Sequence, residues 1–247
     1  MSIPPPATAA ALIIGNEILS GKVDDQNLVV LARALRVLGI RLLRVVVVSD
    51  DVEVIADEVR SLSRSHDWVF TSGGVGPTHD DLTIQGVARA FDTQVEIAPQ
   101  VEALVRSHFG ERFTPGHLLM ARSPRGCQLV SGEGIRWPTV RMHNVWVLPG
   151  VPEVFKMKLA VVTSHLSGGK PFVSRSVYTQ LDEPTLVPLL DDVVTRFPQV
   201  EVGSYPKWRD PDCRTLLTFD GLDEDAVETA CRAFLALLPP SAPRRVE

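Results

Sequence analysis

The sequence predicts an α/β protein with a doubly wound, mostly parallel sheet, followed by a second, smaller two-layer α+β domain. Short apolar runs alternate with amphipathic helical patterns through the first two thirds of the chain, as in parallel strands joined by helices. The segment SGGK at 167–170 then predicts a linker, and beyond it the order changes to strand, helix, two strands and helix. We therefore predict domains at 8–168 and 171–240, after a proline-rich, disordered tail at 1–7.

The strands and helices of the larger domain each follow from a local pattern. Four consecutive valines at 45–48 are typical of a strand that is covered on both faces. Asp50 and Glu53 have the spacing of a capping box, which predicts a helix start beside them. The predicted strands cover 9–14, 40–48, 68–71 and 144–148. The predicted helices cover 25–38, 52–62, 82–91, 99–109 and 152–166, and the stretch between 110 and 143 is predicted to be irregular.

The smaller domain is predicted from apolar faces and short strands. Its first helix carries five apolar side chains on one face, and Pro188 is compatible with that helix only in its first turn. The predicted strands cover 172–179, 200–205 and 213–219. A last helix is predicted at 223–238, which completes a two-layer unit.

Composition limits the class of protein. The 247 residues carry a formal charge of −5, from 25 basic and 30 acidic residues without a basic stripe, so we predict no nucleic-acid partner. No apolar run approaches the roughly 18–20 residues that span a bilayer, and the first residues lack the pattern of a secretory signal. The three cysteines are widely spaced, with no CxxC pair. We therefore expect a cytoplasmic protein without membrane association or structural zinc.

The loop TSGGVGPTHDDLT at 71–83 is the first candidate site. Three glycines between a strand and a helix allow backbone N–H groups to point at a phosphate, and a parallel sheet binds ligands at this edge. The loop is neither a Walker loop nor a GxGxxG motif. A tight turn with Asp80 or Asp81 as the helix N-cap is an equally good interpretation.

Carboxylates at the same edge of the sheet are the second candidate. They follow three successive strands: Glu17, then Asp50, then Asp80 and Asp81. Adjacent aspartates beside an anion site predict a divalent cation that bridges carboxylate and phosphate oxygens. For Asp50 the capping box is a sufficient explanation by itself, and we favour it for this residue. The convergence of these side chains on one edge is the strongest physical argument for a site.

Three further features carry weaker predictions. The turn LPGVPE at 148–153 is typical of a proline-guided helix start, and it follows another strand. His79 and His143 lack the spacing of metal ligands, so structural or solvated roles are favoured. Tyr205 and Trp208, in SYPKW, form a turn that is able to stack on a ring, although aromatic residues are common on surface turns.

Three motifs together carry a resemblance to a known family. GNEILSG, GGVGPTHDDLT and LPGVPE occur in the order and approximate spacing of the MoaB/Mog-like molybdopterin-binding family, which residues 8–166 resemble. Within that family the chain is more similar to the N-terminal domain of competence/damage-inducible proteins of the CinA type. NVWVLPGVPE and GSYPKW resemble most the N-terminal molybdopterin-binding-like domain of eukaryotic FAD synthases. On this resemblance, residues 170–240 correspond to the small domain that follows there.

The resemblance implies roles for particular residues. By position, its acidic site residues fall on Asp81, Asp50 and Glu17. We predict catalytic roles for Asp81 and Asp50, and a metal site formed by Asp80, Asp81 and Glu17. The predicted phosphate-binding residues are Gly73, Gly74, Gly76, Thr78 and Gly150. Asn16 and Ser72 depart mildly from the CinA pattern.

The resemblance also implies an activity. CinA-type domains are associated with metal-dependent hydrolysis of ADP-ribose, and the FAD synthase domain with hydrolysis of FAD, which implies a nucleotide pyrophosphatase that releases AMP. The implied cofactor is a divalent metal (Mg, Co or Mn), with K as a further candidate ion. Two alternatives stay open: a molybdopterin-binding protein of molybdenum cofactor biosynthesis, and a non-catalytic nucleotide-binding module. Relatives of this fold form dimers or trimers, which implies a homo-oligomer that binds a nucleotide or pterin.

Overall fold

The chain folds into two compact units, and the division between them falls after residue 169. The computed structural model describes residues 5–239, 242 and 244–247, and it separates a larger unit at 6–169 from a smaller one at 170–247. Most of the predicted tail at 1–7 lies outside the described residues, and Ala7 already belongs to the first strand. In the described part of the chain, no helix is long and apolar enough to cross a membrane.

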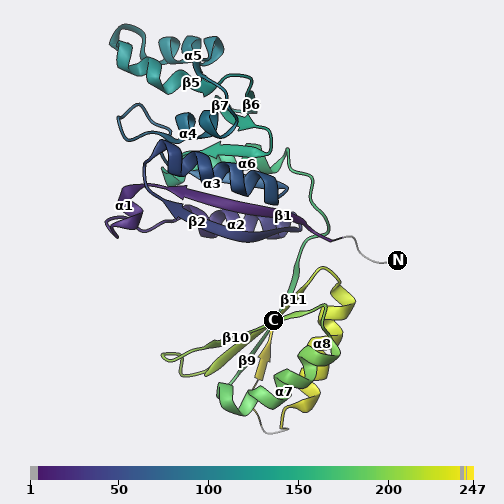
Figure 1. The fold of residues 1–247 in the computed structure, drawn as a ribbon. Coiled ribbons are helices and arrows are strands. Elements are labelled where there is room, and N and C mark those ends of the chain that lie inside the picture. The colour runs from purple at the N-terminus through teal and green to yellow at the C-terminus, as the bar shows by residue number, and fades with distance from the viewer. Residues whose placement is uncertain (1–4, 240–241, 243) are drawn as a thin grey trace. The chain divides into compact units, whose positions relative to one another are not determined.

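The larger unit has a six-stranded, mostly parallel central sheet, as predicted. Its strands are β1 (Ala7–Ile14), β2 (Ile40–Val48), β3 (Trp68–Ser72), β6 (Gln128–Gly132), β7 (Ile135–Met142) and β8 (Val145–Leu148). Their order is β2-β1-β3-β8-β7-β6. Figure 1 shows β2 beside β1. The first four strands in this order pair in parallel, and β7 and β6 add an antiparallel hairpin at one edge. The chain leaves β1 to one side for β2 and then to the other side for β3, so strand order reverses at β1.

Helices cover both faces of this sheet. The helices are α2 (Asn27–Val37), α3 (Val52–Ser65), α4 (Thr83–Ala90) and α6 (Pro152–Thr163). Apolar side chains of α3 and α4 form one core with the sheet, and those of α2 and α6 form a second core on the other face. The unit is therefore a three-layer α/β sandwich, as expected for parallel strands joined by helices.

A small satellite layer completes the larger unit. It contains α5 (Pro99–Phe109), the 3₁₀ turns η1 (Gly110–Arg112) and η2 (Pro115–Ala121), and the short strand pair β4 (Val95–Ile97) and β5 (Arg122–Pro124). Four buried side chains from this region form a separate apolar cluster. The stretch predicted to be irregular thus contains two 3₁₀ turns and the strands β5, β6 and β7. Arginines and glycines within it interrupt the apolar pattern that would reveal these strands.

Two details of the larger unit correct the sequence prediction. The prediction that β2 is covered on both faces is wrong, because β2 pairs only with β1 at the sheet edge and exposes Leu43, Val45 and Val47. The prediction that Asp50 caps α3 is also wrong. Asp51 has the extended backbone of an N-cap, and its carboxylate accepts from the N–H groups of residues 53 and 54 at 2.9 and 3.0 Å.

The smaller unit is a four-stranded antiparallel sheet with two helices on one face. Its elements are β9 (Val173–Thr179), α7 (Glu183–Arg196), β10 (Glu201–Pro206), β11 (Thr215–Gly221), α8 (Glu224–Leu237) and β12 (Arg244–Val246). The order β10-β11-β9-β12 is that of the split βαβ, or ferredoxin-like, topology. The predicted domain stopped at residue 240, before β12. Pro188 lies in the second turn of α7 instead of the first, because the helix begins at Glu183.

Candidate functional site

A cavity of about 580 Å³ lies at the carboxyl ends of β1, β3 and β8. Each of these parallel strands is followed by a segment that lines the cavity, and strand order reverses at β1. Open α/β sheets bind ligands at such a position, and the volume fits a small-molecule ligand. The polar and glycine residues of its wall are Glu17, Gly73, Gly74, Gly76, Asp81, Arg122, Ser123, Gly150 and Lys158.

The glycine loop after β3 is built by its own backbone and by Thr83. Gly73 and Gly74 have φ angles of +107° and +63°, which side chains rarely permit. The Thr83 hydroxyl donates to the Gly73 carbonyl oxygen at 2.8 Å, and the Thr83 N–H donates to the Gly74 carbonyl oxygen at 2.9 Å. The N-cap of α4 is Leu82, with no side-chain bond. The alternative interpretation, an N-cap by Asp80 or Asp81, is therefore wrong.

Asp81 closes the glycine loop instead of capping the helix. Its Oδ2 accepts from the N–H of Thr78 at 2.8 Å and from the Thr78 hydroxyl at 2.5 Å. With its amide oriented to satisfy both neighbours, Gln85 donates to the Asp81 carbonyl oxygen and accepts from Arg122 Nη1. Both Thr78 bonds end on Oδ2, so they leave the lone pairs of Oδ1 for another partner.

Glu17 reaches the same cavity from the segment after β1. This residue lies in the short helix α1 (Asn16–Leu19), and the N–H of Asn16 donates to Asp50 Oδ2 at 2.8 Å. The Glu17 carboxylate lies against Gly15, where a Cβ would be only 2.5 Å from Glu17 Oε1. Asp50 therefore holds the start of the turn that carries Glu17, and it does not itself line the cavity.

The structure gathers most of the predicted site residues but not all of them. Six lie in the cavity wall: Glu17, Gly73, Gly74, Gly76, Asp81 and Gly150. Thr78 lies outside the wall and bonds to Asp81. Asp50 also lies outside it and bonds to Asn16, next to Glu17. Asp80 is exposed, with its Oδ1 3.9 Å from His79 Nδ1. Within the described ranges, no three histidine, cysteine or acidic side chains form a group that could hold a metal ion by themselves. The acidic groups of the cavity wall are the carboxylates of Glu17 and Asp81, and the glycine loop lies beside them.

A buried asparagine joins two of the three segments of the site. Asn27, which is 3% exposed, donates from Nδ2 to the Ser72 hydroxyl at 2.9 Å and to the Gly150 carbonyl oxygen at 2.8 Å. Its amide thus links the end of β3 to the turn after β8. The LPG turn is fixed against the glycine loop by this side chain.

Replacing Asn27 by Ala is expected to lower the free energy of unfolding by about 1–3 kcal/mol, because a buried carbonyl oxygen and a hydroxyl lose their partner. Urea denaturation at 25 °C measures this change. Gln26→Ala is the matched control, because Gln26 is exposed and makes no side-chain cap bond. A loss for Asn27→Ala no larger than the control's would contradict the assigned role.

Arg122, Trp137 and Lys158 were missed by the sequence prediction. Arg122 donates from Nη2 to the Gly76 carbonyl oxygen at 3.3 Å and from Nε to the Leu119 carbonyl oxygen at 3.1 Å. It therefore supports the glycine loop from the stretch predicted to be irregular. The sequence contains one signal for Lys158. It follows Val151 and Val154 at the spacing i, i+3 and i+7, which places it on the apolar side of the helix.

Lys158 lies half-buried in the cavity wall. Its Nζ donates to the carbonyl oxygens of Trp137 at 3.2 Å and Pro138 at 2.7 Å. Burial lowers the pKa of the Lys158 ammonium from 10.5 to about 8. The charged form is thus disfavoured in the folded protein relative to the unfolded chain.

Lys158 is expected to make stability rise with pH between about 8 and 10.5. In this window the unfolded chain binds the proton and the folded protein does not, so the free energy of unfolding increases with pH, by about 1–3 kcal/mol in total. Urea denaturation of wild type and Lys158→Met at pH 7, 9 and 10 measures the difference. Lys156→Met, on the exposed side of α6, should parallel the wild type. Parallel curves for Lys158→Met as well would show that the ammonium bears no burial penalty.

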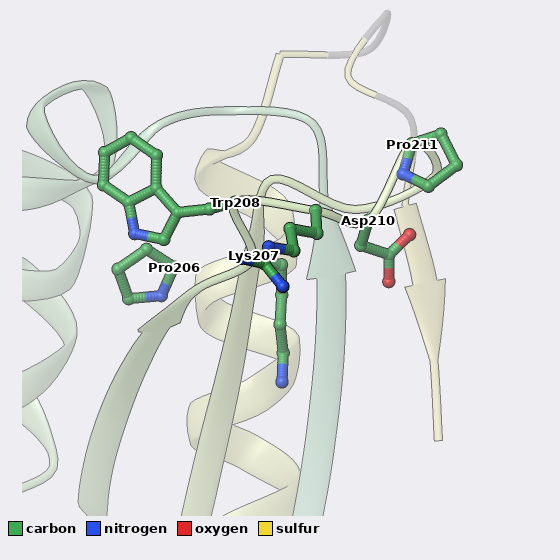
Figure 2. A pocket seen from close by; sticks show the side chains of 6 residues that line it. Pro206, Lys207, Trp208, Asp210 and Pro211 are labelled. Atoms are coloured by element: carbon green, nitrogen blue, oxygen red, sulfur yellow. The ribbon is translucent and has the colours of Figure 1, made fainter.

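A second hollow, of about 610 Å³, lies in the smaller unit. It is lined by the consecutive residues 206–211, and Trp208 is 93% exposed there (Figure 2). Only one loop forms this hollow, so no polar groups from different elements converge on it. The predicted stacking role of Tyr205 and Trp208 stays a prediction.

Comparisons with known proteins bear on both units. Residues 10–167 match the model of the "probable molybdopterin binding domain", and residues 171–247 match "FAD synthase, middle domain". A probable FAD synthase of Caenorhabditis briggsae is 33% identical over 94% of this chain and 49% of its own length. The chain thus spans about half the length of this relative. A protein of Archaeoglobus fulgidus is 33% identical over 91% of this chain and 95% of its own length.

A solved structure resembles the larger unit. The CinA protein of Thermoplasma acidophilum, described as having unknown function, superposes with a TM-score of 0.58 at 30% identity. The match covers 64% of this chain and 98% of that one. The predicted resemblance of fold, to molybdopterin-binding domains with a CinA-like neighbour, is confirmed by these matches.

Proposed function

The chain belongs to the family that carries the probable molybdopterin binding domain, followed here by the middle domain of FAD synthase, and from this premise we propose that it hydrolyses a nucleotide pyrophosphate. The proposed substrate is FAD or ADP-ribose, and one product is AMP. The observation that carries the proposal is that Glu17, Asp81 and the glycine loop line the same cavity. Carboxylates beside an anion-binding loop suit a phosphate ligand that is accompanied by a cation.

The glycine loop is proposed to bind the phosphates. Gly73, Gly74 and Gly76 present backbone without side chains to the cavity, and α4 begins directly after the loop. Backbone N–H groups at a helix start attract anions. Arg122 and Asp81 hold the loop in this shape through the contacts described above.

The carboxylates are proposed to hold the divalent metal. Asp81 and Glu17 fit this role, because each presents oxygen ligands to the cavity and lies against a glycine whose Cβ would collide with the carboxylate. Magnesium is often held by one or two carboxylates together with substrate phosphates. Such an ion, when bound, would polarise a phosphoryl oxygen and lower the pKa of a water ligand. Asp50 would position Glu17, and the proposal leaves out Asp80, which lies outside the cavity.

The reaction consumes one water molecule. The water oxygen forms a bond to the phosphorus of the AMP moiety, and the bond from that phosphorus to the bridging oxygen breaks. The bridging oxygen leaves with the second phosphate, and the proton of the water passes to it or to solvent. The second product is FMN from FAD, or ribose 5-phosphate from ADP-ribose.

Pterin binding is the second candidate function, and the description of the matched family favours it. In this case the same loop would bind the phosphate of molybdopterin, and no AMP would be released. A non-catalytic nucleotide-binding module would use the cavity in the same way. We propose a dimer or trimer for each candidate, which light scattering would measure.

A turnover assay tests the proposal. FAD and ADP-ribose are each offered to the purified protein with and without Mg, Co or Mn, with and without K, and AMP is followed by chromatography. We expect AMP from at least one substrate only when a divalent metal is present. An absence of AMP in every mixture would overturn the hydrolase, and tight binding of molybdopterin would then favour the pterin candidate.

A further inference from the structure

The cavity wall has two chemically different parts. The glycine loop, Glu17 and Asp81 form a polar part, which suits phosphates. Apolar side chains from α5, η2, β6 and β7 form the other part, namely Val101, Met120, Leu129, Trp137 and Val140. An apolar and aromatic wall suits the flat ring of a nucleotide or pterin.

Lys158 is the charged side chain tied to the apolar part. Its Nζ donates to the carbonyl oxygens of Trp137 and Pro138, and both of these residues line the cavity themselves. An ammonium group has three N–H donors, so two are occupied by main-chain oxygens and one is left for a ligand. Because these two bonds already order the Lys158 side chain, ligand binding would cost less side-chain entropy than it would for a mobile lysine.

Arg122, the other cation of the cavity wall, is occupied differently. Its Nε, Nη1 and Nη2 bond to the Leu119 carbonyl oxygen, the Gln85 amide and the Gly76 carbonyl oxygen. Arg122 is therefore used to support the glycine loop. The guanidinium is thus committed to the polar part of the wall, and Lys158 is the cation held at its apolar part.

We propose that Lys158 determines ligand specificity by donating its third N–H to an exocyclic carbonyl oxygen of a fused ring, and that the cavity thereby prefers a flavin or pterin ring to adenine. Flavins and pterins carry such oxygens. Adenine carries an amino group in their place, which would set one donor against another. The inference rests on the proposed function only in taking the ligand to be a phosphorylated heterocycle, and it selects FAD over ADP-ribose as the substrate.

Two monophosphates separate the ring from the phosphate in a binding test. FMN and AMP each carry one 5′-phosphate but differ in the ring, so their dissociation constants report on ring recognition. Isothermal titration calorimetry at pH 7 with magnesium compares wild type, Lys158→Met and Lys156→Met. We expect Lys158→Met to weaken FMN binding by tenfold or more, with AMP binding changed less than twofold. Lys156→Met, on the exposed side of the same helix, should leave both constants unchanged.

The pH dependence gives an independent readout. The other charged groups of the cavity wall are Glu17 of α1, Asp81 of the glycine loop and Arg122 of β5. Because the charged form of Lys158 is lost above about pH 8, FMN affinity should fall between pH 7 and 9 in wild type. The affinity of Lys158→Met should stay constant over this range.

Several outcomes would overturn the inference. They are equal binding of FMN and AMP by wild type, an equal loss for both ligands in Lys158→Met, or no loss at all. Should Lys158→Met fail to fold, Lys158→Gln keeps a neutral donor and is expected to show a smaller loss for FMN alone. A Lys158-dependent preference for FMN without hydrolysis of either FAD or ADP-ribose would uphold this inference and overturn the proposed activity. Hydrolysis of ADP-ribose without a preference for FMN would support the proposed activity and overturn this inference.

Discussion

Asp81→Asn is expected to reduce metal-dependent AMP release by about a hundredfold to a thousandfold while leaving the fold intact. Asparagine keeps an oxygen that can accept from the N–H and hydroxyl of Thr78, so the loop can close as before. It removes one of the two negative charges that the cavity offers to a cation. The loss should therefore appear in turnover at saturating substrate and should lessen as the metal concentration is raised.

Asp80→Asn is the matched control for this variant. Asp80 is the neighbouring residue of the same loop, and its carboxylate is exposed outside the cavity. Its turnover should equal that of wild type. Full activity in Asp81→Asn, or the same loss in both variants, would contradict the role that we assign to Asp81.

Alanine substitutions at two glycines of the loop are expected to affect different properties: Gly76→Ala should reduce turnover, and Gly73→Ala should reduce stability. A Cβ on Gly76 would be 2.5 Å from Asp81 Oδ2, and this φ angle is not positive, so the carboxylate must move while the backbone stays. Gly76→Ala should therefore lose turnover about as strongly as Asp81→Asn, with less than about 1 kcal/mol of stability lost. A Cβ on Gly73 would be 2.1 Å from the Ile14 carbonyl oxygen of β1, at a φ of +107°. Gly73→Ala should lower the free energy of unfolding by about 3 kcal/mol.

Urea denaturation and AMP release, measured on the same preparations, separate the two effects. Gly76→Ala should denature close to wild type and release little AMP. Gly73→Ala should denature at clearly lower urea. Wild-type turnover in Gly76→Ala would show that the position of the Asp81 carboxylate does not matter for the reaction.

The parts of the site that the sequence could predict are those with a local signal. The apolar strand before Gly73 and the positive φ angles that glycine permits both belong to one short segment, so the loop could be found without a structure. The convergence of Glu17 and Asp81 follows from parallel strands, whose carboxyl ends share an edge. Asp50 was expected at the same edge as a helix cap, yet it holds Asn16, because the cap falls on Asp51.

The remaining parts depend on packing that leaves no local pattern. Arg122 and Trp137 lie in a stretch whose strands are interrupted by charged residues, so their approach to the cavity is visible only in three dimensions. Lys158 appeared to be an ordinary lysine of an amphipathic helix until its bonds to the β7 backbone were seen. The exposed side chains of Leu43, Val45 and Val47 on β2 show the same limit. A run of valines is compatible with a central strand and with an edge strand, so the sequence does not distinguish them.

The pairing of β12 with β9 has a consequence for how the smaller unit can be combined with other proteins. Val246 lies opposite Val177, and Glu247 exchanges both backbone hydrogen bonds with Ser176, so the last strand runs back toward the point where the chain enters the unit. Residue 247 and the first half of β9 are therefore neighbours on adjacent strands. A module with adjacent ends can be inserted into a loop of another domain without separating the flanking residues.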